Sequence, residues 1–269
     1  MPRLYVSSTT LEPGLRGDEF DLDFETAKKL VRVLRLTAGE TFVAFDGLGG
    51  EWDCALTHVE NERKNFKARA TILAPRETKP EGRLQLSVAQ AIPKGDKMEF
   101  VLQKGTELGV AEFWPFEAER SVPRLLGDAD DGGERATQRA GRWRRIVEAA
   151  CAQCGRAQVP VVHAIGDFAT AVSYGTQGGR CFMLDEDPLA PSLREVLTRA
   201  PLFDEEAPAD ETVRIMLLIG PEGGWAERER EWAERYGAEP VGLGRLVLRT
   251  ETAALAAAAI LQWETGDLG

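Results

Sequence analysis

Two glycine-rich turns in the last quarter of the chain constrain its fold more than any other feature. The first, at residues 220–225, reads GPEGGW, and the second, at residues 243–253, reads LGRLVLRTETA. Each follows a short apolar run and opens a helical pattern, as turns from a strand to a helix do. In open α/β folds such turns meet at the carboxyl edge of the sheet, where ligands bind. The two turns are therefore predicted to form two walls of one pocket.

The residues around the first turn indicate why glycine is needed there. Residues 213–219 form a continuous apolar run, typical of a strand covered on both faces, and residues 226–236 carry glutamates early and stop at Gly237. Glycines between such a strand and helix let backbone N–H groups approach a ligand, and the helix N-terminus adds partial positive charge. An isolated GPEGG is more often only a tight turn, and the second motif is what favours a binding site.

The second turn leads into an alanine-rich segment, residues 253–263. A helix of this composition packs closely on several sides. Thr250 or Thr252 is predicted to cap its first turn, because threonine hydroxyls accept from free N–H groups at helix starts.

The pair of turns resembles the C-terminal signature of the SPOUT-type 16S rRNA (uracil-N3)-methyltransferase family. The chain departs from the family pattern at 246–248, where it reads LVL and Arg-Ile-Leu is common. Upstream, KGTELGV at 104–110, ERS at 119–121 and QCGR at 153–156 are similar to family blocks in the same order. The resemblance covers most of the chain.

This resemblance implies an α/β fold, with a SPOUT-type trefoil-knotted methyltransferase domain preceded by a small PUA-like β-barrel that binds RNA. The expected division is 1–74 for the barrel, 75–82 for a linker and 83–269 for the methyltransferase domain. The knot would surround S-adenosylmethionine, and no periodicity predicts it, because knots are almost absent from folds in general. The family also implies a homodimer, with the alanine-rich last helix as its interface. The alternative for that helix is an ordinary buried core helix.

Composition fits such a protein. A chain of 269 residues with 43% hydrophobic content suits two modest domains. No stretch approaches the length of a membrane helix, and a cytoplasmic protein is expected. Cys151 and Cys154 form a Cys-x-x-Cys without a second pair, so the four cysteines are predicted to be free thiols and no metal is expected.

The net charge of −11 argues against a polyanionic partner, because phosphate contacts supply much of the affinity for RNA. Two segments, 127–134 and 204–211, carry nine of the excess acids and are predicted to be solvated loops. The remainder is nearly neutral, so RNA binding needs only a local basic face.

The pattern of the first 74 residues is β-like, with a hairpin at 47–50 and a helix between 24 and 36 that has one basic side. From residue 84 onward predicted strands, one of them at 159–165, alternate with predicted helices, which indicates a parallel sheet with helical crossovers. A predicted helix at 134–154 places several arginines on one face. These basic faces are candidates for RNA contact, although solvated charge is the common alternative. The candidate RNA contacts are Lys28, Arg32, Arg35, Arg120, Arg142, Arg145 and Arg156.

The chemistry that the resemblance implies has clear requirements. Uracil N3 carries a proton on the base-pairing edge, so the base must be unpaired or extruded from its stack. The main contribution of the protein to the rate is then to align N3 with the methyl donor. A general base and a cation for the charge on the uracil oxygens also help. Carboxylates close to the predicted pocket are Asp185, Glu186, Glu222 and Glu251. Among them the sequence does not identify the base.

Three residues are the catalytic candidates, and a wider set is implied for the cofactor. Arg249 is the candidate cation, and Glu222 and Glu251 are the candidate carboxylates. Helix capping for Glu222 and placement in a first helical turn for Glu251 are equally good explanations. The resemblance implies cofactor contacts from Leu184, Gly220, Pro221, Glu222, Gly223, Gly224, Leu243, Gly244, Leu246, Leu248, Arg249 and Thr250, of which Leu246 departs from the family pattern.

The predicted function is S-adenosylmethionine-dependent methylation of uridine N3 in the 16S rRNA of the small ribosomal subunit. An alternative of a different class is a non-catalytic rRNA-binding or assembly factor that keeps the same fold. A nucleotide-binding oxidoreductase is disfavoured, because the chain has no G-x-G-x-x-G after a strand with an acid about twenty residues later.

Overall fold

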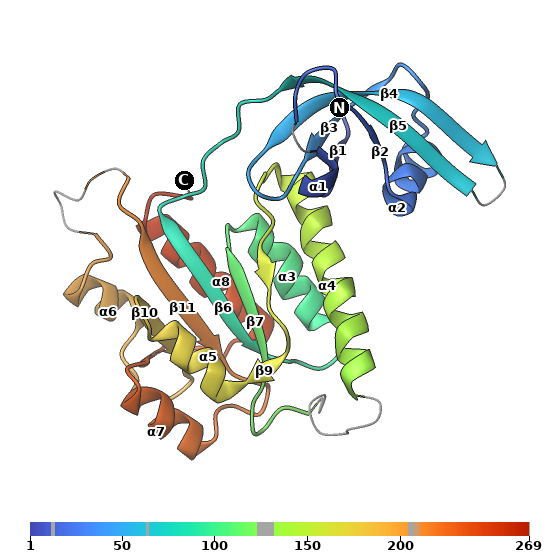
Figure 1. Cartoon of the computed structure of the whole chain (residues 1–269). Coiled ribbons are helices and arrows are strands. Elements are labelled where there is room, and N and C mark those ends of the chain that lie inside the picture. Colours follow the sequence, from blue (N-terminus) through green and yellow to red (C-terminus); the bar gives the residue numbers. More distant parts are fainter. Residues whose placement is uncertain (12–13, 63–64, 123–131, 204–207, 209, 269) are drawn as a thin grey trace. The chain divides into compact units, whose positions relative to one another are not determined.

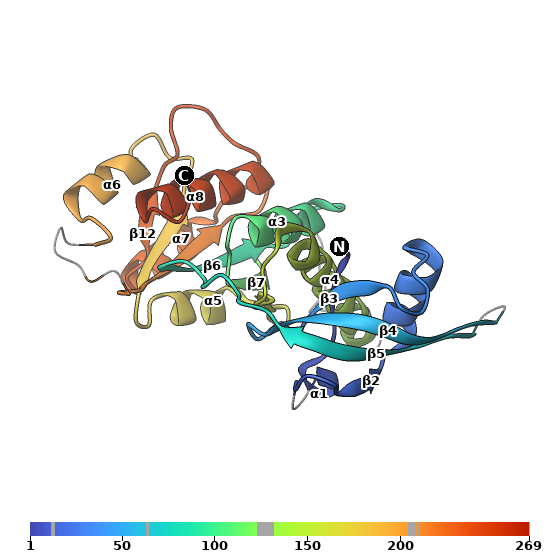
Figure 2. The same ribbon diagram turned by 90° about the horizontal axis from the view of Figure 1, so that it is seen from above.

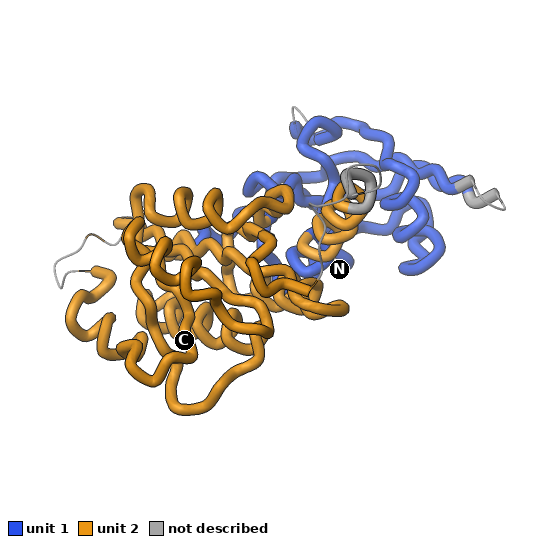
Figure 3. Tube along the Cα trace, turned by 90° about the horizontal axis from the view of Figure 1, so that it is seen from below, with its two compact units in different colours: residues 1–81, 148–159 blue, residues 82–147, 160–269 orange. Residues whose placement is uncertain are grey.

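The computed structural model describes residues 1–11, 14–62, 65–122, 132–203, 208 and 210–268. The chain divides into two compact units, Met1–Glu81 with Glu148–Val159, and Gly82–Val147 with Pro160–Gly269 (Figure 3). The two acidic segments predicted as solvated loops, 127–134 and 204–211, lie mostly outside the described residues.

The first unit contains a five-stranded sheet in the order β1-β3-β4-β5-β2 (Figure 1). Its strands are β1 (Arg3–Tyr5), β2 (Glu19–Asp21), β3 (Thr41–Phe45), β4 (Glu51–Glu62) and β5 (Asn65–Pro75). Strands β3 and β4 are antiparallel, which confirms the predicted hairpin. In its turn the Asp46 carboxylate accepts hydrogen bonds from the N–H groups of Leu48 and Gly50, and Gly47 and Gly49 have φ of 79° and 109°. Glycine is favoured at both positions because few L side chains adopt positive φ.

The predicted helix at 24–36 is only partly correct. Helix α2 (Phe24–Lys28) begins at the N-cap Asp23, whose carboxylate accepts from Thr26 N–H, and continues as a π-helical turn, η1 (Lys29–Val33). Leu34 N–H bonds the Lys29 carbonyl five residues back, and Arg35 has a φ of 59°. The positive φ of Arg35 ends the helix before the expected Leu36. A further short helix, α1 (Ser8–Leu11), precedes β2.

The segment Glu148–Val159 belongs to the first unit, and Arg3 is bonded to it. The Arg3 guanidinium donates hydrogen bonds to the carbonyls of Cys151 (2.6 Å) and Arg156 (2.8 Å), and it also pairs with Glu51. All four cysteines are free, which confirms the prediction for Cys151 and Cys154. Burial raises the pKa of the Cys151 thiol to about 12, which keeps it protonated and unreactive.

The second unit contains a parallel sheet in the order β12-β10-β11-β6-β7-β8, with β9 also paired to β7. The predicted parallel sheet is therefore confirmed. The single strand predicted at 159–165 is wrong: the chain makes two separate two-residue pairings with β7, because β8 and β9 meet different parts of it. The strands are β6 (Leu84–Ala91), β7 (Glu112–Glu117), β8 (Val161–Val162), β9 (Gly166–Asp167), β10 (Arg180–Leu184), β11 (Val213–Ile219) and β12 (Glu239–Val241).

Helices cover both faces of this sheet (Figures 1 and 2). On one face α8 packs on β6, β11 and α3, and on the other α5 packs on β7, β10 and β11. Side chains of α5 and α7 bury Met216 and Leu218 of the central strand. The helices are α3 (Lys97–Glu107), α4 (Gly132–Cys154), α5 (Phe168–Gly175), α6 (Leu193–Arg199), α7 (Glu227–Arg235) and α8 (Thr250–Glu264). Among the described helices, none has the length and apolar character that crossing a bilayer requires.

Candidate active site

The two glycine-rich turns lie at the same edge of the sheet. Strands β6, β10, β11 and β12 are parallel, so the turn after β11 and the turn after β12 both leave from the carboxyl ends of their strands. After β12, at the edge of the sheet, the chain returns to its centre, where α8 packs. This return brings the second turn back towards the first.

Trp225 organises the first turn. Its ring is buried, and its Nε1–H donates a hydrogen bond to the Leu184 carbonyl at 2.8 Å. A Cβ on Gly220 would stand 3.1 Å from this ring, so glycine allows the close approach. Gly224 has a φ of 68°, and its N–H bonds the Pro221 carbonyl at 3.0 Å. Trp225 therefore fixes Leu184 and Gly220, two of the predicted cofactor residues, in one rigid arrangement.

The second turn exposes apolar side chains. Leu246 and Val247 are each 74% exposed, and Leu248 and Arg249 are exposed as well. Gly244 has a φ of 130°, a conformation that favours glycine. Arg249 has no ion pair with any side chain in the described parts of the chain. Exposed leucines next to a free arginine give this turn both apolar and cationic contacts for a ligand.

The predicted capping by Thr250 or Thr252 is wrong. Helix α8 begins at Thr250 itself, with Arg249 at the N-cap position and no side-chain cap. The Thr250 hydroxyl donates instead to the Gly220 carbonyl at 2.7 Å and accepts from Gln90 Nε2 at 2.8 Å. Thr250 therefore links the start of the second turn's helix to the first turn.

A lysine stands between the two candidate catalytic carboxylates. Lys97 Nζ lies 2.8 Å from Glu222 Oε1 and 3.7 Å from Glu251 Oε2. Glu222 also accepts from Lys94 N–H at 3.2 Å. Burial raises the pKa of the Glu222 carboxyl, but the hydrogen bonds from Lys97 and from backbone N–H groups outweigh it, and the net pKa lies below the usual value. The hydrogen bond to Glu222 raises the pKa of Lys97, so the pair is ionised.

The other two carboxylates named from the sequence have different surroundings. Asp185 is almost fully buried and pairs with Arg230 at 2.8 Å, so it has a structural partner. Glu186 is exposed, and a Cβ on Gly224 would stand 3.2 Å from its Oε1.

Sequence reasoning missed Gln90 and Lys97. Gln90 is fully buried at the carboxyl end of β6, yet it interrupts an apolar strand, LQLSVAQA, and a polar residue in such a run is a usable signal. Lys97 opens α3 in a segment without any motif. Both come from elements upstream of the two turns.

The candidate RNA contacts fall into two groups. Arg120 lies at the first turn, because its Nη1 donates to the Gly223 carbonyl at 3.2 Å and the Glu229 carboxylate ties the neighbouring Glu119 N–H to α7. Arg156 is mostly buried and pairs with Glu81 at 2.6 Å, which engages its guanidinium inside the first unit. Of the rest, Lys28 pairs with Glu25, Arg142 pairs with Glu99, and Arg32, Arg35 and Arg145 are exposed.

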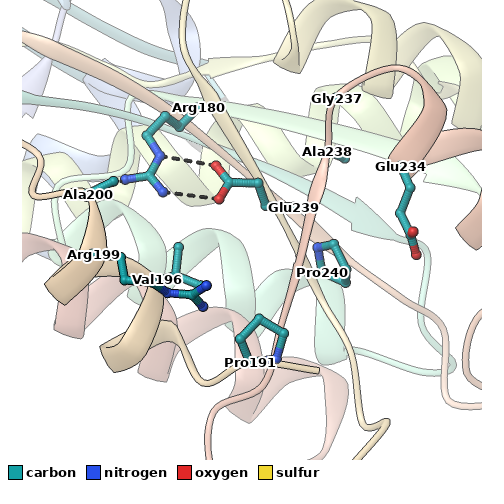
Figure 4. A pocket seen from close by; sticks show the side chains of 10 residues that line it. All are labelled: Arg180, Pro191, Val196, Arg199, Ala200, Glu234, Gly237, Ala238, Glu239 and Pro240. Atoms are coloured by element: carbon teal, nitrogen blue, oxygen red, sulfur yellow. Dashed lines mark hydrogen bonds and ion pairs between the residues drawn. The ribbon is translucent and has the colours of Figure 1, made fainter. Parts of the chain in front are cut away.

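A pocket of about 520 Å³ lies elsewhere in the second unit (Figure 4). Arg180 and Glu239, which open β10 and β12, face each other there as a bidentate ion pair. Since they are at the amino ends of their strands, this pocket is at the edge opposite the two turns. It contains none of the predicted site residues. Its lining residues are Arg180, Pro191, Val196, Arg199, Ala200, Glu234, Gly237, Ala238, Glu239 and Pro240.

Within the described ranges no group of three or more His, Cys, Asp or Glu side chains is arranged to hold a metal ion. The donor set at the two turns is instead one of apolar side chains, backbone groups, carboxylates and exposed arginines. Such a set suits an organic ligand with a flat ring and a positive charge.

Comparisons with known proteins agree on one family. Residues 80–262 match a family model described as an RNA methyltransferase domain, and residues 30–68 match one described as an RNA methyltransferase PUA domain. Ribosomal RNA small subunit methyltransferase E of Bacillus subtilis is 29% identical, over 97% of this chain and 96% of that protein. The protein of the same description from Mycobacterium bovis is 31% identical, over 84% and 79% respectively. The crystal structure of ribosomal RNA small subunit methyltransferase E from Neisseria gonorrhoeae bound to S-adenosyl methionine is similar with a TM-score of 0.79 and 32% identity, covering 98% of this chain and 97% of that chain.

Proposed function

Because the chain belongs to the RNA methyltransferase family, we propose that it transfers a methyl group from S-adenosylmethionine to N3 of a uridine in the 16S rRNA of the small ribosomal subunit. The observation that carries this proposal is the hydrogen-bonded junction of the two turns, in which Thr250 bonds both Gly220 and Gln90. This junction assembles the motif residues of both turns at one sheet edge.

The residues of the two turns fit the methyl donor. Exposed Leu246 and Leu248 offer apolar surface for an adenine ring, and Gly244, with a φ of 130°, leaves room beside them. When bound, S-adenosylmethionine supplies an electrophilic methyl group on a sulfonium centre. The other proposed contacts are Pro221, Glu222, Gly223, Gly224, Leu243, Arg249 and Thr250.

Gly223→Val is expected to reduce the affinity for S-adenosylmethionine at least tenfold. A Cβ at Gly223 would stand 3.2 Å from Arg120 Cβ, closer than most real contacts, so a branched side chain displaces the first turn. The measurement is calorimetric titration with S-adenosylmethionine. Gly166→Val in β9 is the matched control, because nothing lies within 4 Å of its Cβ position. Unchanged affinity of the Gly223 variant would mean that the turn is only structural.

Arg249 and the two carboxylates are the proposed catalytic groups. Loss of the N3 proton spreads negative charge over N3 and both uracil oxygens, and a guanidinium donates to such an oxygen in a bidentate geometry that lysine lacks. Arg249 is exposed and unpaired among the described residues, so its donors are available. Alignment of the ring with the methyl group is the remaining contribution of the site.

We also propose that the second unit contains a trefoil knot and that the chain is divided into a barrel, a linker and a methyltransferase domain. The return of the chain from β12 to the centre of the sheet supports a trefoil knot around the donor site. The match of residues 30–68 to a PUA domain supports a barrel at 1–74, a linker at 75–82 and a methyltransferase domain at 83–269.

The proposed RNA contacts with free or exposed guanidinium groups are Arg32, Arg35, Arg120 and Arg145. A cytoplasmic location follows from a ribosomal substrate.

The proposed homodimer would use the exposed apolar face of α8. Trp263 is 66% exposed, and Ile260 on the same helix and Phe100 on the packed helix α3 are also exposed. Large aromatic side chains at the centre of an interface carry much of its binding energy. This face suits a second copy of the chain better than solvent.

Trp263→Asp is expected to weaken this dimer by about 30-fold or more, equal to ~2 kcal/mol, because a carboxylate would replace an aromatic side chain that the proposed interface buries. Sedimentation equilibrium measures the change in dissociation constant. The neighbouring exposed Glu264→Ala is the control. A Trp263 variant with wild-type association would exclude this face as the interface.

A transfer assay tests the proposed function. Small ribosomal subunits lacking the modification are incubated with labelled S-adenosylmethionine, and the labelled nucleotide is mapped. A single label on uridine N3 supports the enzyme. Binding to the subunit without transfer would instead support the alternative, a non-catalytic rRNA-binding or assembly factor.

A further inference from the structure

The two carboxylates of the candidate site differ in their hydrogen bonding. Glu222 Oε1 accepts from Lys97 Nζ at 2.8 Å and from Lys94 N–H at 3.2 Å. These donors occupy the lone pairs of that oxygen and stabilise the ionised form. A carboxylate engaged in this way is a weak proton acceptor.

One carboxylate oxygen of Glu251 accepts no hydrogen bond from the described residues. Its side chain is only 13% exposed, its Oε2 is buried, and none of the described residues donates a hydrogen bond to that oxygen. Lys97 Nζ is 3.7 Å away, beyond hydrogen-bonding distance. A buried acceptor without a donor costs roughly 1–3 kcal/mol, and more when charged, so such an atom is typically completed by water or by a ligand.

Gln90 helps to fix the position of Glu251. The single hydroxyl hydrogen of Thr250 is donated to the Gly220 carbonyl, so Thr250 must accept from Gln90, which orients the Gln90 amide with Nε2 towards Thr250. The same Nε2 also donates to the Ala91 carbonyl. Thr250 immediately precedes Glu251 in the first turn of α8. The hydrogen-bond chain therefore holds this turn against residues 220–225.

Two cations and one further carboxylate lie near Glu251. Lys97 of α3 and Arg249 of the second turn are the nearby cations, and Glu222 is shielded from Glu251 by Lys97 between them.

We propose that Glu251, rather than Glu222, accepts the N3 proton of the target uridine. This inference rests on the proposed function. The N3–H bond breaks and its proton passes to Glu251 Oε2. The electron pair left on N3 forms the new N–CH₃ bond while the bond from carbon to sulfur breaks, and that pair stays on sulfur. Glu251 then releases the proton to solvent.

The test is the pH dependence of single-turnover methyl transfer to unmodified small subunits. Glu251→Gln is expected to lower the rate at neutral pH by about 10²–10⁴-fold, the usual contribution of a general base. Because the uracil must then ionise without help, the rate of this variant is expected to rise about tenfold per pH unit as hydroxide replaces the base. Glu222→Gln is expected to change the KM for the donor without producing that slope.

A second measurement separates a base from a structural residue. Subunits containing 5-fluorouridine have a more acidic N3, and they are expected to restore much of the rate of Glu251→Gln while changing the wild-type rate little. Titration with S-adenosylmethionine checks that the variant still binds the donor.

The possible results distinguish a failure of the role proposed for Glu251 from a failure of the proposed function. A Glu251→Gln variant with wild-type rate, or one that binds the donor but is inactive at every pH and is not restored by 5-fluorouridine, would overturn the role of Glu251. The slope appearing in Glu222→Gln instead would reverse the assignment. Wild-type transfer to an atom other than uridine N3 would overturn the proposed function itself.

Discussion

Arg249→Ala is expected to lower kcat/KM for methyl transfer by about 10²–10³-fold, the effect of removing one donor to a developing oxyanion. Arg249 is exposed and makes no ion pair with the described residues, so its loss leaves the packing of α8 unchanged. The chain is therefore expected to keep its thermal midpoint while losing transfer. The measurement combines the transfer assay with thermal denaturation.

The matched control for this prediction is Arg194→Ala. Arg194 is an exposed arginine on α6, distant in sequence from both turns. Equal loss in both variants would indicate a general effect of positive charge on RNA binding. Near-normal turnover by Arg249→Ala would refute a role for its guanidinium in the reaction.

Trp225→Ala is expected to lower the free energy of unfolding by about 3–5 kcal/mol, as for other buried aromatic residues. The ring packs beside Phe116 and Phe168 and against Gly220, and its N–H satisfies the Leu184 carbonyl. Removing it leaves a cavity under the first turn and an unpaired buried carbonyl. Urea denaturation measures the loss, and donor binding is expected to fall with it.

Trp225→Phe separates packing from hydrogen bonding. Phenylalanine keeps most of the apolar contact but cannot donate to Leu184, so about 1–3 kcal/mol of the loss is expected to remain. If both variants were as stable as the wild type, the turn would be held by its backbone alone and Trp225 would not organise it.

The regular parts of the fold follow from local patterns. The hairpin between β3 and β4 was predictable because Asp46, Gly47 and Gly49 are residues that tight turns require. The parallel sheet was predictable because apolar runs such as 213–219 alternate with helical segments. The early end of the helix was not predictable, since the positive φ at Arg35 belongs to a residue with no intrinsic preference for it.

Glycines and charged residues in the sequence pointed to some of the residues that the structure brings together at the two turns, but buried partners left no such signal. Glu222, Glu251 and Arg249 were named because polar residues beside glycine turns are conspicuous. Thr250 was predicted to cap a helix, but its hydroxyl instead bonds Gly220 and Gln90, which are distant in sequence. Only the tertiary structure determines such contacts. Lys97 gained its place between two carboxylates from the packing of α3, which leaves no pattern in the sequence.

The bonds of Arg3 to the carbonyls of Cys151 and Arg156 have a consequence for how this protein can be divided. A fragment cut at the end of the linear N-terminal region would retain the guanidinium and lose both of its acceptors, because those come from residues more than a hundred positions later. The N-terminal module is thus built from two separate segments of the chain. A chimera with another enzyme would have to include both segments.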